Sequence, residues 1–281
     1  MEDRFLDFRI ENEPWYVSTR ASQKDRFGKA LALIQRYCGD LDLACDIGCA
    51  DGQFSLKLAS VARRVLAIDR HKGRIEGNKN RYKDLTNLRF VCLDILRDPI
   101  PSDPPDLVTA LEILYYFSRE EQELFMQRIV ELLKPGGFFL MSVNVFRGSR
   151  FTEETVRGLL QRHFHLVAEK PIYRNVYYRF ELKIIRLIDE LNYLEKLRIF
   201  TPNILKLNRS FYPGKWNYLL LRPSWFMDRI AIPLVRQGAL RLIRSRILYT
   251  AITGMTKLLL PRRGKSQILF LARKEATHAG D

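Results

Sequence analysis

One short segment, Asp46-Ile-Gly48-Cys49-Ala50-Asp51-Gly52, joins a run of apolar residues to a helical pattern. Glycines at such a turn let the backbone approach a ligand closely and adopt dihedral angles that a side chain disfavours. Two later apolar runs end near Asp69 and Asp94. A carboxylate in these places could accept hydrogen bonds from ribose hydroxyls or meet an adenine amino group. The chemistry that these residue types suggest is nucleoside binding.

A second group of reactive side chains follows the run 106–111. Glu112 could act as a base towards an acceptor, or it could orient a ligand or cap a helix. Tyr115 and Tyr116 could form an aromatic wall around a reacting group or pack in the core. Both interpretations stay open for each residue from the sequence.

These residues need a scaffold that gathers the ends of their strands. From residue 41 onward, β-rich runs alternate with helical patterns, which predicts an α/β fold with a doubly wound, mainly parallel seven-stranded sheet and helices on both faces. In such a sheet, ligands bind at the carboxyl ends of the strands. The predicted strands are 41–47, 64–69, 88–94, 106–111, 138–143, 164–170 and 267–273, and the predicted helices are 54–62, 72–83, 120–133 and 152–162.

Residues 41–145 resemble class I S-adenosylmethionine-dependent methyltransferases. That family has an acidic-x-Gly-x-Gly-x-Gly turn after its first strand, an acidic residue ending the second strand and an Asp after the third. Those positions hold Asp46, Gly48, Ala50, Gly52, Asp69 and Asp94, with Ala50 in place of the middle glycine. The turn Leu133-Lys-Pro-Gly-Gly137 is also typical of the family.

The resemblance implies S-adenosylmethionine as the cofactor and assigns roles around it. The turn from Gly48 to Gly52 passes beneath its methionine and ribose, with Cys49 as a small residue rather than a reactive thiol. Asp46 contacts the turn or the methionine ammonium. Asp69 binds the ribose diol, Asp94 and Ile95 hold the adenine, and Arg70 shields the adenine edge. No metal is required.

A dinucleotide-binding domain is the competing interpretation of the same turn, because such domains present helix-terminal amides to a pyrophosphate. Asp46 and Asp51 would repel a pyrophosphate, whereas a sulfonium that carries an ammonium tolerates them. The acidic residues therefore favour the methyltransferase.

A closer likeness is carried by Glu13-Pro-Trp15-Tyr16, Gln23–Phe27 and Leu111–Phe117. These segments are similar to the nodulation methyltransferases that N-methylate a glucosamine unit of a chitin-type oligosaccharide. The likeness covers about the first 150 residues and implies a small or saccharide-containing acceptor.

The predicted organisation has five parts: an N-terminal cap or lid over 1–38, a methyltransferase core over 39–178, a helical basic insertion over 179–265, the last core strand over 266–275 and a tail over 276–281. Trp15, Tyr16 and Arg20 could belong to the lid over the cofactor or could simply pack against the core. In the alternative, Asn175–Ile184 is the last strand and everything after it is an appendage.

Charge is distributed unevenly along the 281 residues, whose net charge is +15. Residues 1–150 hold 23 basic and 22 acidic side chains, whereas 151–281 hold 24 and 10. Between Arg229 and Lys274 there are 11 basic residues and no acidic one. This segment should be drawn to phosphates.

Three interpretations of 229–265 remain open. A helix over 234–251 places Leu240, Ile243 and Ile247 along one side and Gln237, Arg241 and Arg244 on another. With the upstream aromatic residues, this favours an anionic membrane surface and a lipid-linked acceptor. Alternatively, the helix is a cap over the pocket with its arginines in water. A nucleic-acid substrate is the third option, and it is less favoured because no base-methylating signature follows residue 111.

Composition is that of a folded globular protein, because 47% of residues are hydrophobic and 28% charged. The four cysteines contain no Cys-x-x-Cys pair, which argues against a zinc site and for a reducing compartment. The acidic start differs from a secretory signal, so we expect a cytoplasmic protein, at most peripheral on the inner membrane face. The expected function is methyl transfer to an amine or hydroxyl of a small, saccharide-containing or lipid-linked acceptor. The alternatives are a nucleic-acid methyltransferase and a catalytically silent binding protein with the same fold.

Overall fold

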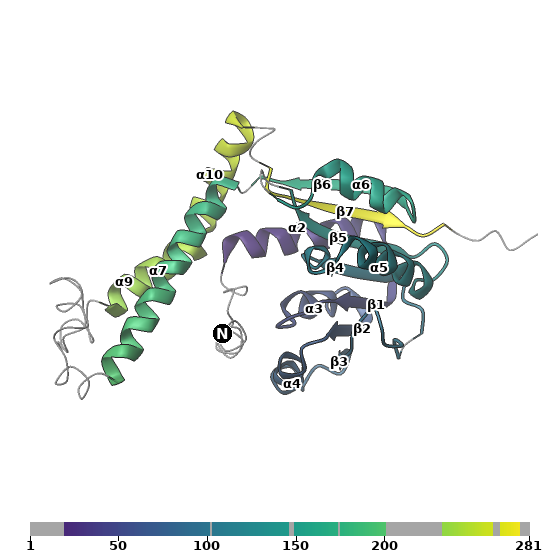
Figure 1. Cartoon of the computed structure of the whole chain (residues 1–281), viewed down its shortest axis with the longest axis horizontal. Coiled ribbons are helices and arrows are strands. Elements are labelled where there is room, and N and C mark those ends of the chain that lie inside the picture. The colour runs from purple at the N-terminus through teal and green to yellow at the C-terminus, as the bar shows by residue number, and fades with distance from the viewer. Residues whose placement is uncertain are drawn as a thin grey trace, which may run out of the picture. The chain divides into compact units, whose positions relative to one another are not determined.

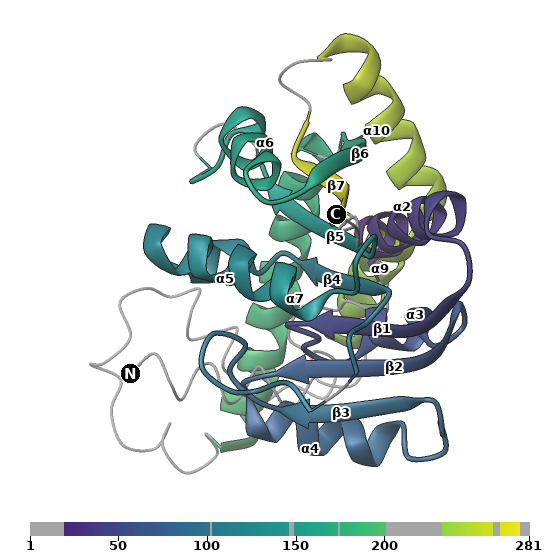
Figure 2. The same cartoon turned by 90° about the vertical axis from the view of Figure 1, so that its right-hand side faces the viewer.

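Seven strands form one sheet in the order β3-β2-β1-β4-β5-β7-β6 (Figures 1 and 2). The computed structural model describes residues 20–101, 103–145, 149–173, 175–200, 232–260 and 265–275. β7 runs antiparallel to β5 and β6, and the pairs among β1 to β5 are parallel. The predicted α/β fold class is confirmed. The strands are β1 (Leu41–Ile47), β2 (Ala62–Asp69), β3 (Leu88–Cys92), β4 (Leu107–Leu111), β5 (Phe138–Asn144), β6 (His165–Ile172) and β7 (Gln267–Arg273).

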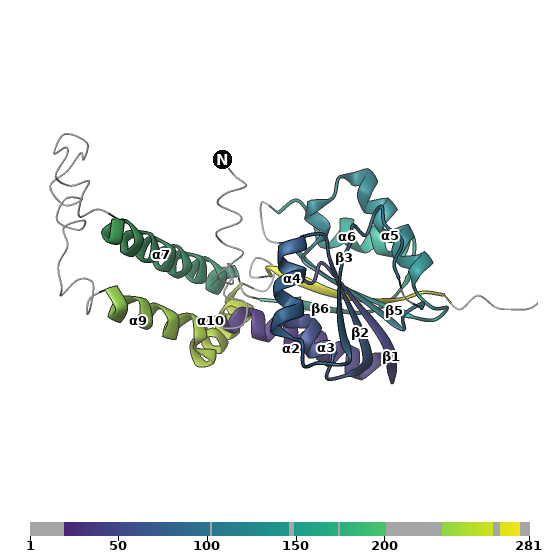
Figure 3. The ribbon, with the colours of Figure 1, turned by 90° about the horizontal axis from the view of Figure 1, so that it is seen from below.

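Helices cover both faces of the sheet, each over its own apolar cluster. Phe27 of α2 (Ala21–Tyr37), Leu58 of α3 (Gln53–Leu58) and Ile75 of α4 (Lys72–Arg81) belong to one cluster. Phe125 of α5 (Arg119–Leu132) and Leu160 of α6 (Glu153–Gln161) belong to the other. Figure 3 shows α5 and α6 on the side of the sheet opposite α2 and α3. The sheet is therefore buried on both faces, as the continuous apolar runs of β1 and β4 require.

Local signals explain where the core helices begin and end. Ser118 and Glu121 form a reciprocal capping box at the start of α5. After α5, Gly136 adopts a φ of +75°, and the Gly137 amide donates to the Lys134 carbonyl at 2.9 Å. This turn returns the chain to β5, next to β4.

Among the described residues, three helices lie between β6 and β7 in the chain: α7 (Asn175–Phe200), α9 (Ile232–Arg244) and α10 (Arg246–Leu259). Residues Val176–Met255 form a compact unit of their own. Within it, the buried Tyr177 donates its hydroxyl to the Ile243 carbonyl at 3.3 Å, and its ring meets that of Tyr249 edge-on at 4.9 Å. The alternative strand at 175–184 is wrong, because Tyr177, Glu181, Ile185 and Ile188 are buried at helical spacing.

The predicted helix over 234–251 is also wrong in one respect, because the chain breaks at Ser245. The Ser245 hydroxyl accepts a hydrogen bond from the Leu248 amide at 3.2 Å, which caps the start of α10. The break changes the helical phase, so Ile243 is buried and Ile247 is 85% exposed rather than both facing one side.

Some expectations fall outside the described residues, namely those on Trp15 and Tyr16 of the N-terminal lid and on the tail 276–281. Arg20, the last residue of the expected lid, is described; it precedes α2 and is buried. In the described part of the chain, none of the helices combines the length and apolar character needed to cross a bilayer.

Candidate active site

The turn after β1 has a backbone that only small residues adopt readily. Gly48 and Gly52 both have φ of +71°, and Ala50 has φ of +48°. A Cβ atom on Gly48 would lie 2.4 Å from Cγ2 of Ile113, and one on Gly52 would lie 2.9 Å from Cε2 of Tyr82. The two glycines are therefore required by both dihedral angle and space, whereas alanine is accommodated at position 50.

Asp69, the last residue of β2, holds this turn. Its Oδ2 accepts a hydrogen bond from the Ala50 amide at 2.9 Å, and its Oδ1 accepts one from the His71 amide at 2.9 Å. The carboxylate thus lies beside the glycine turn at the carboxyl edge of the sheet, as predicted for a ribose-binding group.

Asp46 lies beneath the turn and is buried. Its two oxygens accept hydrogen bonds from the hydroxyls of Thr109, at 2.7 Å, and Ser55, at 2.6 Å. Burial raises the pKa of Asp46 to about 6, an effect that these two donors oppose. These two hydrogen bonds link β1 to α3 and β4. The expected contact of Asp46 with the turn or with the methionine ammonium stays a prediction.

Helix α4 and Tyr82, the residue that follows it, supply contacts to the turn that the sequence did not predict. Asn78 donates to the Ala50 carbonyl at 2.7 Å, and the Tyr82 hydroxyl donates to the Asp51 carbonyl at 3.2 Å. Arg74 lies 3.5 Å from the Asp51 carboxylate. The signal available in the sequence was a polar helical segment directly after Asp69; the burial of Asn78 is known only from the structure.

Cys49, within the turn, is buried, and burial raises the pKa of its thiol well above the ordinary value. A thiol in this state is a poor nucleophile. The geometry agrees with its interpretation as a small packing residue.

The residues expected near adenine lie at the same edge but make separate contacts. Asp94 follows β3 by two residues, accepts a hydrogen bond from the Leu96 amide at 3.0 Å and lies 3.9 Å from Arg97. Ile95 is buried, and Arg70 is exposed after β2. Asp69 therefore contacts the turn directly, and Asp46 lies in β1 just before it, whereas Asp94 lies one strand further along, in the order β3-β2-β1.

Glu112 follows β4 with a φ of +64°, a strained value for a residue with a side chain. Its carboxylate accepts hydrogen bonds from the Ser142 hydroxyl at 2.9 Å and the Asn144 amide at 2.5 Å, both on β5. Arg26 of α2 lies 3.8 Å away. Such strain is found at functional sites where surrounding contacts maintain it. Ser118, not Glu112, caps α5, so the helix-cap interpretation is wrong.

Sequence reasoning identified Glu112 and singled out Gln23–Phe27, which contains Arg26, but it predicted none of the contacts that Glu112 makes with its three partners. Ser142 and Asn144 end an apolar strand, and their polar character at that end was the available signal. Arg26 comes from a helix 86 positions earlier, and no local pattern connects it with Glu112.

Tyr115 and Tyr116 lie on the 3-10 helix η1 (Leu114–Tyr116), with ring centroids 4.6 Å apart. Tyr116 is 65% exposed, whereas Tyr115 is partly buried against the α5-side cluster. Burial, together with the Glu112 carboxylate, raises the pKa of Tyr115 far above its usual value. Tyr115 therefore keeps its proton near neutral pH and can donate a hydrogen bond, but it cannot act as a base.

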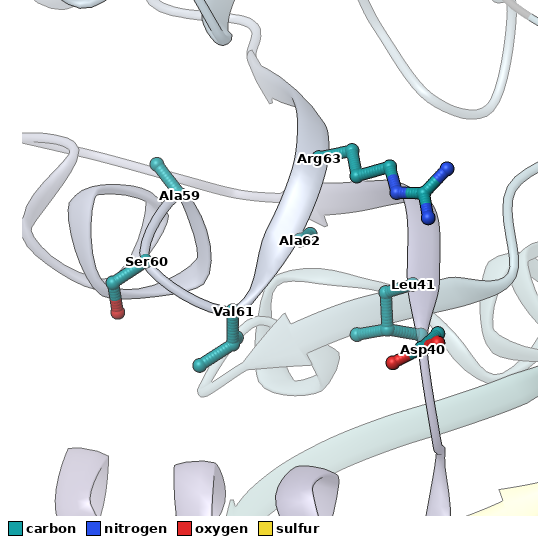
Figure 4. Close-up of a pocket in the computed structure, with 7 residues that line it drawn as sticks. All are labelled: Asp40, Leu41, Ala59, Ser60, Val61, Ala62 and Arg63. Carbon is teal, nitrogen blue, oxygen red and sulfur yellow. The ribbon is translucent and has the colours of Figure 1, made fainter.

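A hollow of about 300 Å³ lies at the other edge of the sheet, where β1 and β2 begin (Figure 4). Parallel α/β sheets bind ligands at the carboxyl ends of their strands, so this hollow is not the cofactor site. Its lining consists of Asp40, Leu41, Ala59, Ser60, Val61, Ala62 and Arg63. Across the described residues, His, Cys, Asp and Glu form no group of three able to hold a metal ion.

The residues around the turn fit S-adenosylmethionine. A turn with positive φ at Gly48, Ala50 and Gly52 lies next to a carboxylate suited to a ribose diol. The acidic side chains nearby, Asp46 and Asp51, suit a cofactor carrying positive charge better than a pyrophosphate.

Comparison with known proteins agrees with this geometry. Residues 44–137 match the family model described as a methyltransferase domain. Phosphoethanolamine N-methyltransferase 1 of Triticum aestivum is 28% identical over 151 residues, which cover 53% of this chain and 30% of that protein. Nodulation protein S of Bradyrhizobium diazoefficiens is 29% identical over 125 residues, covering 44% of this chain and 59% of that protein. The chain thus spans less than two thirds of either relative.

Solved structures show the same fold. The N-methyltransferase NodS from Bradyrhizobium japonicum WM9, in complex with S-adenosyl-L-homocysteine, superposes with a TM-score of 0.53 at 25% identity, covering 60% of this chain and 88% of that one. The 1,6-didemethyltoxoflavin-N1-methyltransferase of Burkholderia thailandensis has a TM-score of 0.55 at 14% identity, covers 97% of this chain and 86% of that one, and supports the fold alone.

The fold and the cofactor edge define a class I S-adenosylmethionine-dependent methyltransferase domain, whose cofactor is S-adenosylmethionine. Within that class, the chain is similar to nodulation protein S and to the phosphoethanolamine N-methyltransferases.

Proposed function

We propose that this protein transfers a methyl group from S-adenosylmethionine to an amine or hydroxyl of a small, saccharide-containing or lipid-linked acceptor, and that nitrogen is the favoured atom. The observation that carries the proposal is the glycine turn, held by Asp69 at the carboxyl edge of β1 and β2. The similarity to N-methyltransferases supports nitrogen over oxygen.

In this proposal, the chain's residues bind and orient the cofactor. The backbone of Gly48–Gly52, with Cys49 and Ala50, supports its methionine and ribose, and Asp69 accepts hydrogen bonds from the ribose diol. Asp94 and Ile95 hold the adenine, and Arg70 covers its edge. When bound, the cofactor supplies an electrophilic methyl group on a sulfonium.

Glu112, Tyr115 and Tyr116 face the acceptor in the proposed site. Ser142 and Asn144 fix the orientation of the Glu112 carboxylate, which suits it to accept a hydrogen bond from an acceptor amine. Tyr115 keeps its proton, so it contributes a hydrogen-bond donor and an aromatic surface rather than a base. Alignment of the acceptor with the methyl group then provides most of the rate enhancement.

Calorimetry with S-adenosylmethionine tests the cofactor site. Asp69→Asn should weaken binding about 10- to 100-fold, since hydrogen bonds to a charged group contribute about 1.5–3 kcal/mol. Asp84→Asn, an equal change of charge at an exposed position, is the matched control and should leave the affinity unchanged. Equal affinities for the Asp69 variant and the control would remove the assigned cofactor site.

Methyl transfer to a panel of acceptors tests the substrate class. Amino sugars, phosphorylated ethanolamines, lipid-linked saccharides, their hydroxyl counterparts and RNA should be compared with labelled S-adenosylmethionine. Labelling confined to amine-bearing acceptors is the expected result. Labelling of RNA alone would overturn the small-acceptor assignment, and cofactor binding with no transfer to any acceptor would favour a silent binding protein.

A further inference from the structure

Helix α10 exposes large apolar side chains to solvent. Ile247, Met255 and Leu258 are 85%, 61% and 80% exposed, and Ala251 between them is exposed as well. Their spacing of four, four and three residues places them on one side of the helix. We call these four residues the apolar stripe. Contiguous exposed apolar surface of this kind marks an interaction site in soluble proteins.

The other sides of α10 have different characters. Tyr249 and Thr256 are buried, so they mark the side of α10 that packs against the rest of the protein. Arg246 and Lys257 are exposed and lie, by helical geometry, on one flank of the apolar stripe. An apolar strip with basic residues beside it is the pattern of helices that lie in the interface of a bilayer.

Helix α9 likewise has one side with exposed apolar residues and one buried side. Leu234 and Leu242 are exposed, and Ile232, Ala239 and Ile243 are buried. A hollow of about 300 Å³ on α9 is lined by Gln237, Leu240, Arg241 and Arg244. Its two guanidinium groups come from successive turns of the helix and suit a phosphate group.

The charge of this helix pair is of one sign. Over residues 232–260 there are five basic side chains and no acidic one. A second copy of the same surface would place positive charge against positive charge, which disfavours self-association. A nucleic acid would satisfy the basic residues but leave the apolar stripe in water.

We propose that α9 and α10 dock on an anionic lipid bilayer, with the apolar stripe inserted among the acyl chains and the basic side chains beside the lipid phosphates. The inference does not depend on the proposed methyl transfer, because it rests only on the exposed surface of these helices.

Sedimentation of the full-length protein with lipid vesicles tests the docking. Vesicles of phosphatidylcholine with phosphatidylglycerol should bind the protein at low salt, and vesicles of phosphatidylcholine alone should bind it far less. Raising the salt concentration should weaken but not abolish binding, because the apolar contribution is not screened.

Two variants separate the apolar and basic contributions. Ile247→Glu with Leu258→Glu should reduce the partition coefficient on anionic vesicles roughly tenfold or more. Its control, Leu56→Glu with Leu124→Glu, makes the same charge change at exposed leucines of α3 and α5, and its partition coefficient should fall much less.

Arg244→Gln with Lys257→Gln should also weaken binding, about tenfold. Arg63→Gln with Arg89→Gln, at exposed positions of the core domain, is the control with equal loss of charge.

Several results would overturn the docking. One is that the protein does not bind anionic vesicles, and another is that the stripe variant and its control lose vesicle affinity equally. A third is that the stripe variant still binds vesicles but no longer forms a dimer, or no longer binds RNA, as the wild-type protein does. Folding of each variant is checked by circular dichroism and by calorimetry with S-adenosylmethionine in the absence of lipid. If the wild-type protein does not bind S-adenosylmethionine, the proposed function is contradicted, whereas the result with vesicles still stands.

Discussion

Charge is organised differently at the carboxyl edge of the sheet and in the helix pair α9–α10. At the sheet edge, the carboxylates of Asp46, Asp69 and Glu112 each accept two hydrogen bonds from backbone or side-chain donors of the protein. In the helix pair the charged side chains are all basic, and most of them are exposed beside apolar residues. Buried charges need specific partners, and so they define one geometry. Exposed charges of one sign favour any surface of opposite sign.

The difference separates two kinds of specificity. The sheet edge is preorganised, because its turn, strands and helix α4 are joined by hydrogen bonds without a ligand. In the helix pair, Arg241, Arg244, Arg246 and Lys257 are exposed, and recognition there would depend on area, charge and salt. Substitutions should therefore affect stability strongly at the first region and weakly at the second.

The largest effect is expected for Gly48→Val. A β-branched residue would suffer from the positive φ and from overlap with Ile113, costing about 2–5 kcal/mol of unfolding free energy in total. Cofactor binding should be lost with it. Denaturant unfolding and calorimetry measure both quantities, and a variant with wild-type stability would show that the turn is less constrained than its geometry indicates.

Asp46→Asn should remove a pH dependence of stability. The group ionises near its ordinary pKa of 3.8 when unfolded but near 6 when folded. Between these values the folded state binds more protons, so this group's contribution falls as pH rises from about 4 to 6. Wild type should lose about 2–3 kcal/mol there relative to the variant, at 1.36 kcal/mol per pKa unit.

Urea unfolding at several pH values measures the effect of Asp46→Asn. Asp84→Asn, at an exposed carboxylate, should run parallel to wild type across the same range. Parallel curves for the Asp46 variant as well would mean that burial does not perturb this carboxyl group.

Arg26→Gln and Glu112→Gln should be coupled. The two side chains are about nine-tenths buried and 3.8 Å apart, and they join α2 to the end of β4. In a double-mutant cycle of unfolding free energy, contacting charged groups of this kind give about 1–2 kcal/mol. Simple additivity of the two substitutions would show that Arg26 does not position Glu112.

The smallest effect is expected in the second region, for Gly254→Ala in α10. Nothing lies within 4 Å of a Cβ atom added there, and the position is within a helix. Alanine should stabilise α10 by about 0.5–1 kcal/mol. Hydrogen exchange of the α10 amides measures the gain, and a loss would contradict the contrast with the glycine at position 48.

Much of the core fold was predictable because its signals are local. The apolar runs ending near Asp46, Asp69 and Asp94 predicted three adjacent strands, and the alternation of strands with helices predicted their parallel arrangement. Boundaries were less accurate: β3 ends at Cys92 rather than at residue 94. The break at Ser245 was missed, although a serine preceding an apolar helix is a known start signal.

The sequence by itself determined which residue types stand at the ends of the strands, because the period of apolar residues sets the strands and glycine alone tolerates the turn's dihedral angles. Only the tertiary structure decided which side chains those groups meet. Arg26 reaches Glu112, Asn78 reaches Ala50 and Thr109 reaches Asp46 through the packing of elements far apart in the chain. The exposure of Ile247 was likewise decided in three dimensions, because it depends on which side of α10 packs against its neighbours.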